Sequence, residues 1–243
     1  MAHYYNPTNL ECFDCDIRKA RKEGLFPSVT TKLGILAKEG LTIWRIQQAV
    51  MSALTMPRKE DEPEEEYVKR IYKDADEQSK SASGLGTEFH TAAEKYFRKE
   101  EYSPSDERVR EMIVRLDKWA VDMEIVPLVV EEVFVNHDLK LACRVDIVFR
   151  CFDGDVRKTV IADFKTQNVK DDKMRAYDEW LYQLAGNRIC YGLEVDALWN
   201  IVVSTNPETL GNIYVKKWTH DERINGIGVF INLNKLYNCI KEI

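Results

Sequence analysis

The chain has 243 residues, of which 44% are hydrophobic and 31% are charged, a composition typical of a globular α/β domain with one large core. No apolar run approaches the ~18 residues that a membrane helix needs, and the first residues lack the pattern of a secretion signal. We therefore expect a cytoplasmic protein without a membrane partner. The net charge of −6 argues against a broad DNA-coating surface but is compatible with one local positive groove.

Six cysteines are present, and without an export signal they are expected to be free thiols. Cys12 and Cys15 form a single CxxC, whereas zinc and iron–sulfur sites normally need four ligands and no second CxxC follows. Two reduced thiols near a helix start are the favoured interpretation, and metal binding by this pair is the alternative.

The first part of the chain has helical periodicity. Residues 28–56 carry apolar side chains at close to helical spacing, with a break expected at Gly40. The acidic stretch EDEPEEE (60–66) predicts a solvated loop and a helix start, and a mixed helix follows it up to about residue 80. A helical N-terminal region, residues 1–80, is therefore expected.

The remainder, residues 81–243, is expected to form the core domain. A helix is predicted to start at Gly86 and Thr87, and another covers 106–124. After Pro127, β-branched segments separated by turn residues predict a strand meander. The later elements are strands at 128–135, 140–150 and 158–166, a helix at 173–192, strands at 197–204 and 211–218, and a helix at 220–241. The predicted fold is α/β, with a central mixed sheet flanked by helices.

Asp163 and Lys165 stand out because alternation along a strand puts both on one side, with Phe164 on the other. A lone DxK is usually an exposed ion pair, but Asp146 lies in the neighbouring strand among β-branched and aromatic residues. A carboxylate there is costly to bury unless it is paired or holds a cation. Two adjacent carboxylates fit Mg²⁺, and Lys165 could then orient or deprotonate a metal-bound water or stabilise charge on the phosphate.

His90 is the next candidate, on the predicted helix with Glu94 one turn further along the same face. A single histidine on a helix is more often structural than a metal ligand. The carboxylates of the following strands raise the case for His90 as a ligand, because they would supply the other half of a site.

Together these motifs resemble a known series. GTEFH (86–90), CRVD (143–146), ADFKT (162–166) and YQLAG (182–186) are similar to the motifs of RecB-like PD-(D/E)XK nucleases. The lead-in PSVTT (27–31) and Trp44 extend the resemblance, which covers roughly residues 25–205.

The resemblance implies a PD-(D/E)XK (restriction endonuclease-like) core and a Mg²⁺-dependent DNA nuclease, with Mn²⁺ as a substitute. It implies Asp146, Asp163 and Lys165 as catalytic residues, and metal ligation by His90, Asp146, Asp163 and the carbonyl of Phe164. An exonuclease of replication, recombination or repair, in a bacterial or phage-infected cell and with proteins of those pathways as further partners, is expected. DNA endonuclease or flap cleavage is the alternative.

Substrate contacts are expected on the helix after the sheet. Gln183 matches the glutamine of the family's QxxxY motif, whereas Asn187 stands at its tyrosine position. Tyr182 and Thr166 are further substrate-binding candidates. The four-cysteine cluster of some members is not matched, so no iron–sulfur cluster is expected.

Other residues have two interpretations each. Glu131 or Glu132 is expected near the metal or in a solvent-facing pair. The remaining candidates would contact phosphates or stack on unpaired bases, although a solvated surface or core packing is commoner for each. They are Lys170, Lys173, Arg175, Trp44, Tyr177 and Trp180.

The rival functions fall into two classes, another type of enzyme and a non-enzymatic module. His137-Asp138 is an HD pair, as in HD phosphohydrolases, but it falls in a predicted turn, and a non-haem iron oxygenase would need more β-structure. A nuclease fold retained only as a DNA-binding module is the non-enzymatic alternative, and the intact set of Asp146, Asp163 and Lys165 argues against it.

Overall fold

A five-stranded mixed sheet forms the centre of the molecule in the computed structural model, which describes residues 2–36 and 39–242. The strand order is β4-β5-β6-β7-β8, with β6 and β7 parallel and the other neighbours antiparallel. The strands are β4 (Val126–Asn136), β5 (Leu141–Asp153), β6 (Val156–Gln167), β7 (Ala197–Ser204) and β8 (Ile213–Lys217). The expected α/β class with a mixed central sheet is confirmed.

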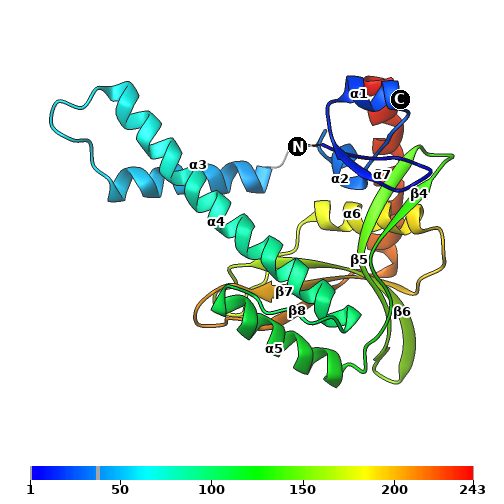
Figure 1. The fold of residues 1–243 in the computed structure, drawn as a ribbon. Coiled ribbons are helices and arrows are strands. Elements are labelled where there is room, and N and C mark those ends of the chain that lie inside the picture. The colour runs from blue at the N-terminus through cyan, green and yellow to red at the C-terminus, as the bar shows by residue number, and fades with distance from the viewer. Residues whose placement is uncertain (1, 37–38, 243) are drawn as a thin grey trace.

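Helices cover both faces of this sheet (Figure 1). On one face, side chains such as Phe89 and Met112 pack against Phe149 and Trp199 of the sheet, and we call this the α4–α5 core. It is formed by the C-terminal half of α4 (Glu64–Arg98) and by α5 (Glu107–Asp122). The other face carries α2 (Val29–Leu33), α6 (Asp178–Tyr191) and α7 (His220–Lys241), which we call the α6–α7 core.

The α6–α7 core depends on close helix contacts. A Cβ atom added at Gly186 of α6 would lie 2.6 Å from the ring of Phe230 on α7 and 2.8 Å from Val29 on α2. Three helices therefore meet at a position that has room only for a hydrogen atom. This junction fixes the placement of α6, the helix that carries Gln183.

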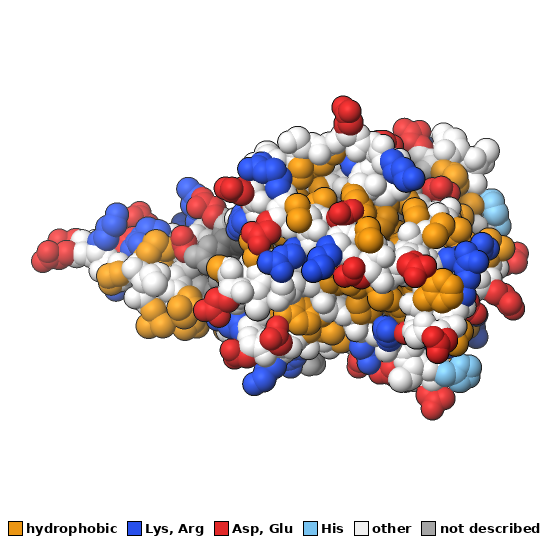
Figure 2. Space-filling model, turned by 90° about the horizontal axis from the view of Figure 1, so that it is seen from below, with side chains coloured by type: hydrophobic (Ala, Val, Ile, Leu, Met, Phe, Trp, Pro, Cys, Tyr) orange, Lys and Arg blue, Asp and Glu red, His pale blue; other side chains and the backbone are white. Residues whose placement is uncertain are grey.

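A helical arm stands away from the sheet. The arm consists of α3 (Glu39–Thr55) and the N-terminal half of α4, which pack against each other (Figure 1). Ser52 of α3 donates to Asp74 of α4 at 2.7 Å. Figure 2 shows apolar side chains on the surface of this arm, and charges of both signs interspersed on the face in view. Periodicity predicts Val50 and Leu54 on a buried face, but they are 52% and 73% exposed because α3 packs only along part of α4.

The N-terminal region differs from the predicted all-helical extension. A small sheet in the order β2-β1-β3 precedes the arm, together with α1 (Ile17–Glu23). Its strands are β1 (His3–Tyr5), β2 (Cys12–Asp14) and β3 (Phe26–Pro27). Strands of two or three residues are too short to show alternation, which is why the sequence did not reveal them.

Two predicted helix boundaries are wrong. The interruption expected at Gly40 falls earlier, since α2 ends at Leu33 and α3 begins at Glu39; residues 37–38 of the predicted span lie outside the described residues. Helix α4 runs without a break from Glu64 through Gly86 to Arg98, so no helix starts at Gly86. A Cβ on Gly86 would lie 3.0 Å from Thr166 Oγ1, so this glycine allows α4 to approach β6 closely.

Within the described residues, no helix combines the length and the apolar character needed to cross a bilayer.

We expect Gly186→Ala to lower the free energy of unfolding by about 1–3 kcal/mol, because the added methyl group overpacks the helix junction. Gly228→Ala in α7 is the matched control, since nothing lies within 4 Å of its added Cβ. That variant should gain up to about 1 kcal/mol from helix propensity. Urea denaturation measures the free energy of unfolding of both variants. Equal changes in the two would show that the contacts at Gly186 do not limit its size.

Candidate active site

Asp146 lies where strands β5 and β6 separate. The antiparallel ladder between them ends at Ile147 and Ala162, beyond which β6 continues beside β7 alone. The backbone N–H of Phe164 donates instead to Asp146 Oδ2 at 2.9 Å. The carboxylate thus satisfies an amide that has lost its strand partner, and this contact holds Asp146 at the fork.

Three acidic residues occupy equivalent positions on three neighbouring strands. Continuing the β5–β6 register places Asp146 opposite Asp163. The β4–β5 pairs on either side, Val130 with Ile147 and Glu132 with Val145, bracket Glu131 opposite Asp146. A row of carboxylates therefore crosses the sheet, and it continues with Asn200 of β7, which pairs with Asp163.

The regular alternation of side chains between the two faces of the sheet breaks at this row. Val145 and Val148 both belong to the α6–α7 core, although strict alternation would put them on opposite faces. Ile147 between them faces the α4–α5 core. Glu131 adopts a φ of 51°, an unusual backbone conformation for a residue with a side chain. Such strained positions concentrate at functional sites, and here the irregularity directs carboxylates to the fork.

His90 of α4 completes a group that could hold a metal ion. Its Nδ1 atom lies 3.5 Å from Asp146 Oδ2. One ligand atom from each of His90, Glu131 and Asp146 falls within 4.8 Å of the others. Their side chains are 33%, 12% and 13% exposed, so the group is partly sheltered but open to a cleft.

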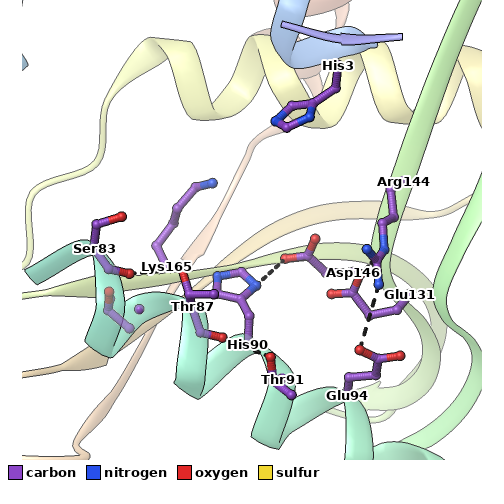
Figure 3. Close-up of a pocket in the computed structure, with 12 residues that line it drawn as sticks. His3, Ser83, Thr87, His90, Thr91, Glu94, Glu131, Arg144, Asp146 and Lys165 are labelled. Atoms are coloured by element: carbon purple, nitrogen blue, oxygen red, sulfur yellow. Dashed lines mark hydrogen bonds and ion pairs between the residues drawn. The ribbon is translucent and has the colours of Figure 1, made fainter. Parts of the chain in front are cut away.

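The cleft has a volume of about 660 Å³ and lies between α4, the fork and β1 (Figure 3). Arg144 lines it and forms ion pairs with Glu131 at 2.6 Å and with Glu94 at 3.7 Å. His3 faces the cleft from the side opposite α4. The cleft floor thus combines carboxylates, an imidazole and cations.

Asp163 and Lys165 lie beside this group, on the α6 side of the sheet. Lys165 Nζ is 2.7 Å from Asp163 Oδ2 and donates to Gln183 Oε1 at 3.1 Å. Gln183 donates to Asp163 Oδ1 at 2.7 Å, and Asn200 donates to Asp163 Oδ2 at 3.0 Å. Trp218 in turn donates to Asn200 at 2.8 Å. The lysine and the aspartate are therefore held in position by a hydrogen-bonded chain that spans three elements.

The acidic cluster carries more negative charge than its surroundings neutralise. Burial, and secondarily the nearby Asp163, raise the pKa of Asp146 to about 6, although His90 and Lys165 oppose the shift. Burial and the charge of Asp146 raise the pKa of Glu131 to about 8, against the lowering effect of Arg144. A bound cation would relieve this repulsion, which is the physical reason to regard the cluster as a metal site.

Of the predicted ligands, His90 and Asp146 come together, and Glu131 joins them, whereas Glu132 faces solvent. Asp163 is adjacent but outside the group of ligand atoms, and its oxygens already accept three contacts. Phe164 supplies an amide to Asp146, and its ring packs in the α4–α5 core.

Only some of the predicted substrate-binding residues lie at the site. Gln183 contacts both Asp163 and Lys165, as described above. Thr166 lines the same cleft as His90, Glu131 and Asp146. Tyr182 packs against the α6–α7 core instead, and Asn187, at the position of the motif tyrosine, is buried.

A second cleft, of about 860 Å³, adjoins the first and shares Thr166 with it. Trp44, Tyr177 and Trp180 line it, together with the cations Lys173 and Arg175. The segment that carries Arg175 is anchored, because its backbone N–H and carbonyl both bond to the Gln167 side chain at 2.9 Å. The exposed Lys170 is not among its lining residues.

Three of the residues in this arrangement were not singled out from sequence. Arg144 stands inside CRVD, but nothing in its local pattern distinguishes a cleft-lining arginine from a surface one. Asn200 carries a weak sequence signal, because an asparagine buried in an apolar strand needs a hydrogen-bond partner. Trp218 is the residue that donates to it.

The other sequence features lie elsewhere. His137 packs edge-on against the Phe26 ring with 5.5 Å between ring centroids. All six cysteines are free thiols, three of them buried.

Comparisons with known proteins add little to this geometry. No family model and no curated protein matches the sequence. A solved structure described as the crystal structure of SSO0001 is similar at 13% identity and a TM-score of 0.32, over 82% of this chain and 86% of that chain.

In metal-free protein, Glu131→Gln should raise the thermal midpoint at pH 8. The folded-state pKa of Glu131, about 8, lies above the ordinary value near 4.5, so the native state binds the extra proton and loses stability as pH rises between those values. Glutamine mimics the protonated form and removes that loss. Each kcal/mol should appear as about 2–4 °C in a chain of this size.

Calorimetry in EDTA at pH 5 and pH 8 measures the effect, which should shrink toward pH 5. Glu132→Gln, an exposed neighbour on the same strand, is the matched control and should show no such pH dependence. A Glu131→Gln variant that is destabilised equally at both pH values would mean that the ion pair with Arg144 outweighs burial and repulsion.

Proposed function

We propose that this protein is a divalent-metal-dependent DNA nuclease of the RecB-like PD-(D/E)XK type. The observation that carries the proposal is the meeting of Asp146 and Glu131 with His90, directly beside the Asp163–Lys165 ion pair. Carboxylates over a cation with an ammonium group alongside are a set suited to phosphodiester hydrolysis. The motif resemblance agrees with this chemistry.

The residues at the fork fit Mg²⁺ or Mn²⁺. Carboxylates suit both ions, and the imidazole of His90 makes Mn²⁺ at least as good a match as Mg²⁺. The raised pKa values of Glu131 and Asp146 give the site an electrostatic need for a cation. When bound, the ion would polarise a phosphate oxygen and lower the pKa of a coordinated water.

Lys165 is the residue positioned to act on the substrate. Its ammonium group forms an ion pair with Asp163, and the hydrogen bond to Gln183 limits its direction. From there it can orient the attacking water and stabilise charge on the phosphate that is being cleaved. Asp163 positions Lys165, and it would become a metal ligand only by giving up one of its present contacts.

The second cleft supports a substrate with an unpaired strand. Aromatic rings stack on bases without regard to sequence, and cations bind the phosphates between them. Trp44, Tyr177 and Trp180 supply the rings, and Lys173 and Arg175 supply the charges. A strand that lies in this cleft would pass Thr166 and reach the metal-binding group, which favours an exonuclease that draws in a DNA end.

Asp146→Asn and Lys165→Ala should each reduce cleavage of labelled DNA by at least roughly 10²-fold, because each removes charge stabilisation from the reaction. Cleavage by the wild type should require Mg²⁺ or Mn²⁺ and stop in EDTA. Gel assays with single-stranded and duplex DNA make the measurement. Asp138→Asn and Lys140→Ala, at the exposed β4–β5 turn, are the matched controls and should keep wild-type activity.

Full activity in Asp146→Asn would disprove the site assignment. A wild-type protein that binds DNA but cleaves none with either metal would instead support the non-catalytic binding module.

Trp44→Ala should raise KM for single-stranded DNA and leave kcat unchanged. Loss of one stacked base costs about 1–3 kcal/mol, or roughly 5- to 150-fold in affinity. Tyr102→Ala, an exposed aromatic outside both clefts, is the control. Steady-state kinetics should be measured on single-stranded DNA and on blunt duplex DNA. An equal KM change on both substrates would contradict a cleft for unpaired bases.

A further inference from the structure

A second group of side chains that could ligate a metal lies on the N-terminal hairpin, separate from the ligand group at the fork. Strands β1 and β2 pair so that His3 lies opposite Asp14 and Tyr5 lies opposite Cys12. Because residues two apart share a face, His3, Cys12 and Asp14 project from the same side of the hairpin. One ligand atom from each falls within 4.8 Å of the other two.

The hairpin is held firmly to the body of the protein at His3. The backbone N–H of His3 donates to Thr31 Oγ1 at 2.9 Å, and its carbonyl accepts from Thr31 Oγ1 at 3.0 Å and from the Ser28 N–H at 2.9 Å. The backbone position of the histidine is therefore set by the α2 N-terminus. A ligand that is already in place loses little conformational freedom on binding an ion, which favours affinity.

The donor set differs in kind from that of the fork. It combines one imidazole, one thiol and one carboxylate, whereas the fork offers two carboxylates and an imidazole. Thiolate sulfur is a soft ligand that selects zinc over magnesium, and zinc accepts sulfur, nitrogen and oxygen together. We propose that His3, Cys12 and Asp14 form a zinc-binding site, independent of the nuclease function proposed above.

The present geometry is close to what zinc requires. Bonds of roughly 2.0–2.3 Å in a tetrahedron place ligand atoms about 3.3–3.8 Å apart. His3 Nδ1 and Asp14 Oδ1 now lie 2.5 Å apart, so their contact would open by about 0.8–1.3 Å on binding. The two side chains are 48% and 52% exposed, which leaves them free to make this adjustment and leaves a fourth position open to water.

Cys15 is not part of this site, although the CxxC spacing suggests a pair. Its side chain packs against the small apolar cluster of Tyr4, Ala20 and Leu25, on the other side of the hairpin from Cys12. The zinc ligand set is therefore formed across the hairpin by His3 and Asp14, and only one cysteine of the motif joins it.

The location gives the ion a structural role. His3 also lines the cleft that contains Asp146 and Lys165. Zinc would cross-link the open end of the β1–β2 hairpin where this end forms the rim of the cleft. Ion binding would thus stabilise the wall that faces α4.

Titration of the full chain with Co²⁺, in excess Mg²⁺ to occupy the fork, tests the site. The wild type should bind one equivalent with a thiolate-to-cobalt absorption band, and Zn²⁺ should displace it. Cys12→Ser should abolish the band and weaken Zn²⁺ binding by more than the roughly 10–100-fold that loss of an outer-shell partner costs. His3→Ala should weaken binding similarly, and Cys15→Ser is the matched control that should keep both signals.

A thermal readout separates binding from misfolding. In excess Mg²⁺, Zn²⁺ should raise the thermal midpoint of the wild type and of Cys15→Ser by more than that of Cys12→Ser, whose circular dichroism should remain that of the wild type. Absence of a cobalt band in the wild type, or its persistence in Cys12→Ser, would overturn the proposal. Neither outcome depends on whether the fork cleaves DNA, because the measurements involve no nucleic acid.

Discussion

Negative charge is concentrated where strands β5 and β6 part, and much of the surrounding structure compensates for it. Glu131, Asp146 and Asp163 stand in one row, where bare carboxylates would repel one another. Arg144 neutralises the first, and Lys165 neutralises the third. Asp146 in the middle accepts from a backbone amide and lies beside the imidazole of His90. The pKa values of Glu131 and Asp146 are both raised, so these neighbours compensate the row incompletely, and this is the basis for proposing a cation here.

Local periodicity was enough to predict most of the sheet and the side chains on its regular part. The five strands and the α5, α6 and α7 helices agree with the predicted ranges to within a few residues, because each has the length that shows its own repeat. Alternation along β6 correctly put Asp163 and Lys165 on one side, and the Gln183 contacts confirm it. The pattern of a regular strand thus gave half of the candidate site.

The remaining residues of the candidate site lie where the alternation of the strands breaks. Alternation is lost at Glu131 and Asp146, and no local pattern distinguishes a strand that changes faces from one that does not. The choice between Glu131 and Glu132 could not be made without the register of three strands. Gly86 and Thr87 indicated a helix start because both residue types suit the N-cap position, yet α4 runs through them and packs against the sheet. Tertiary contacts decide at these points.

Helix α4 has 35 residues, which at 1.5 Å per residue makes a rod of about 52 Å. One end of this rod forms the arm, and the other bears His90 and is clamped by Phe89 and Ala93 in the core. Because an unbroken helix is stiff, a force on the arm would tilt the C-terminal half of α4, which is packed in the core. Such a tilt would change the distance between His90 on α4 and Asp146 on β5.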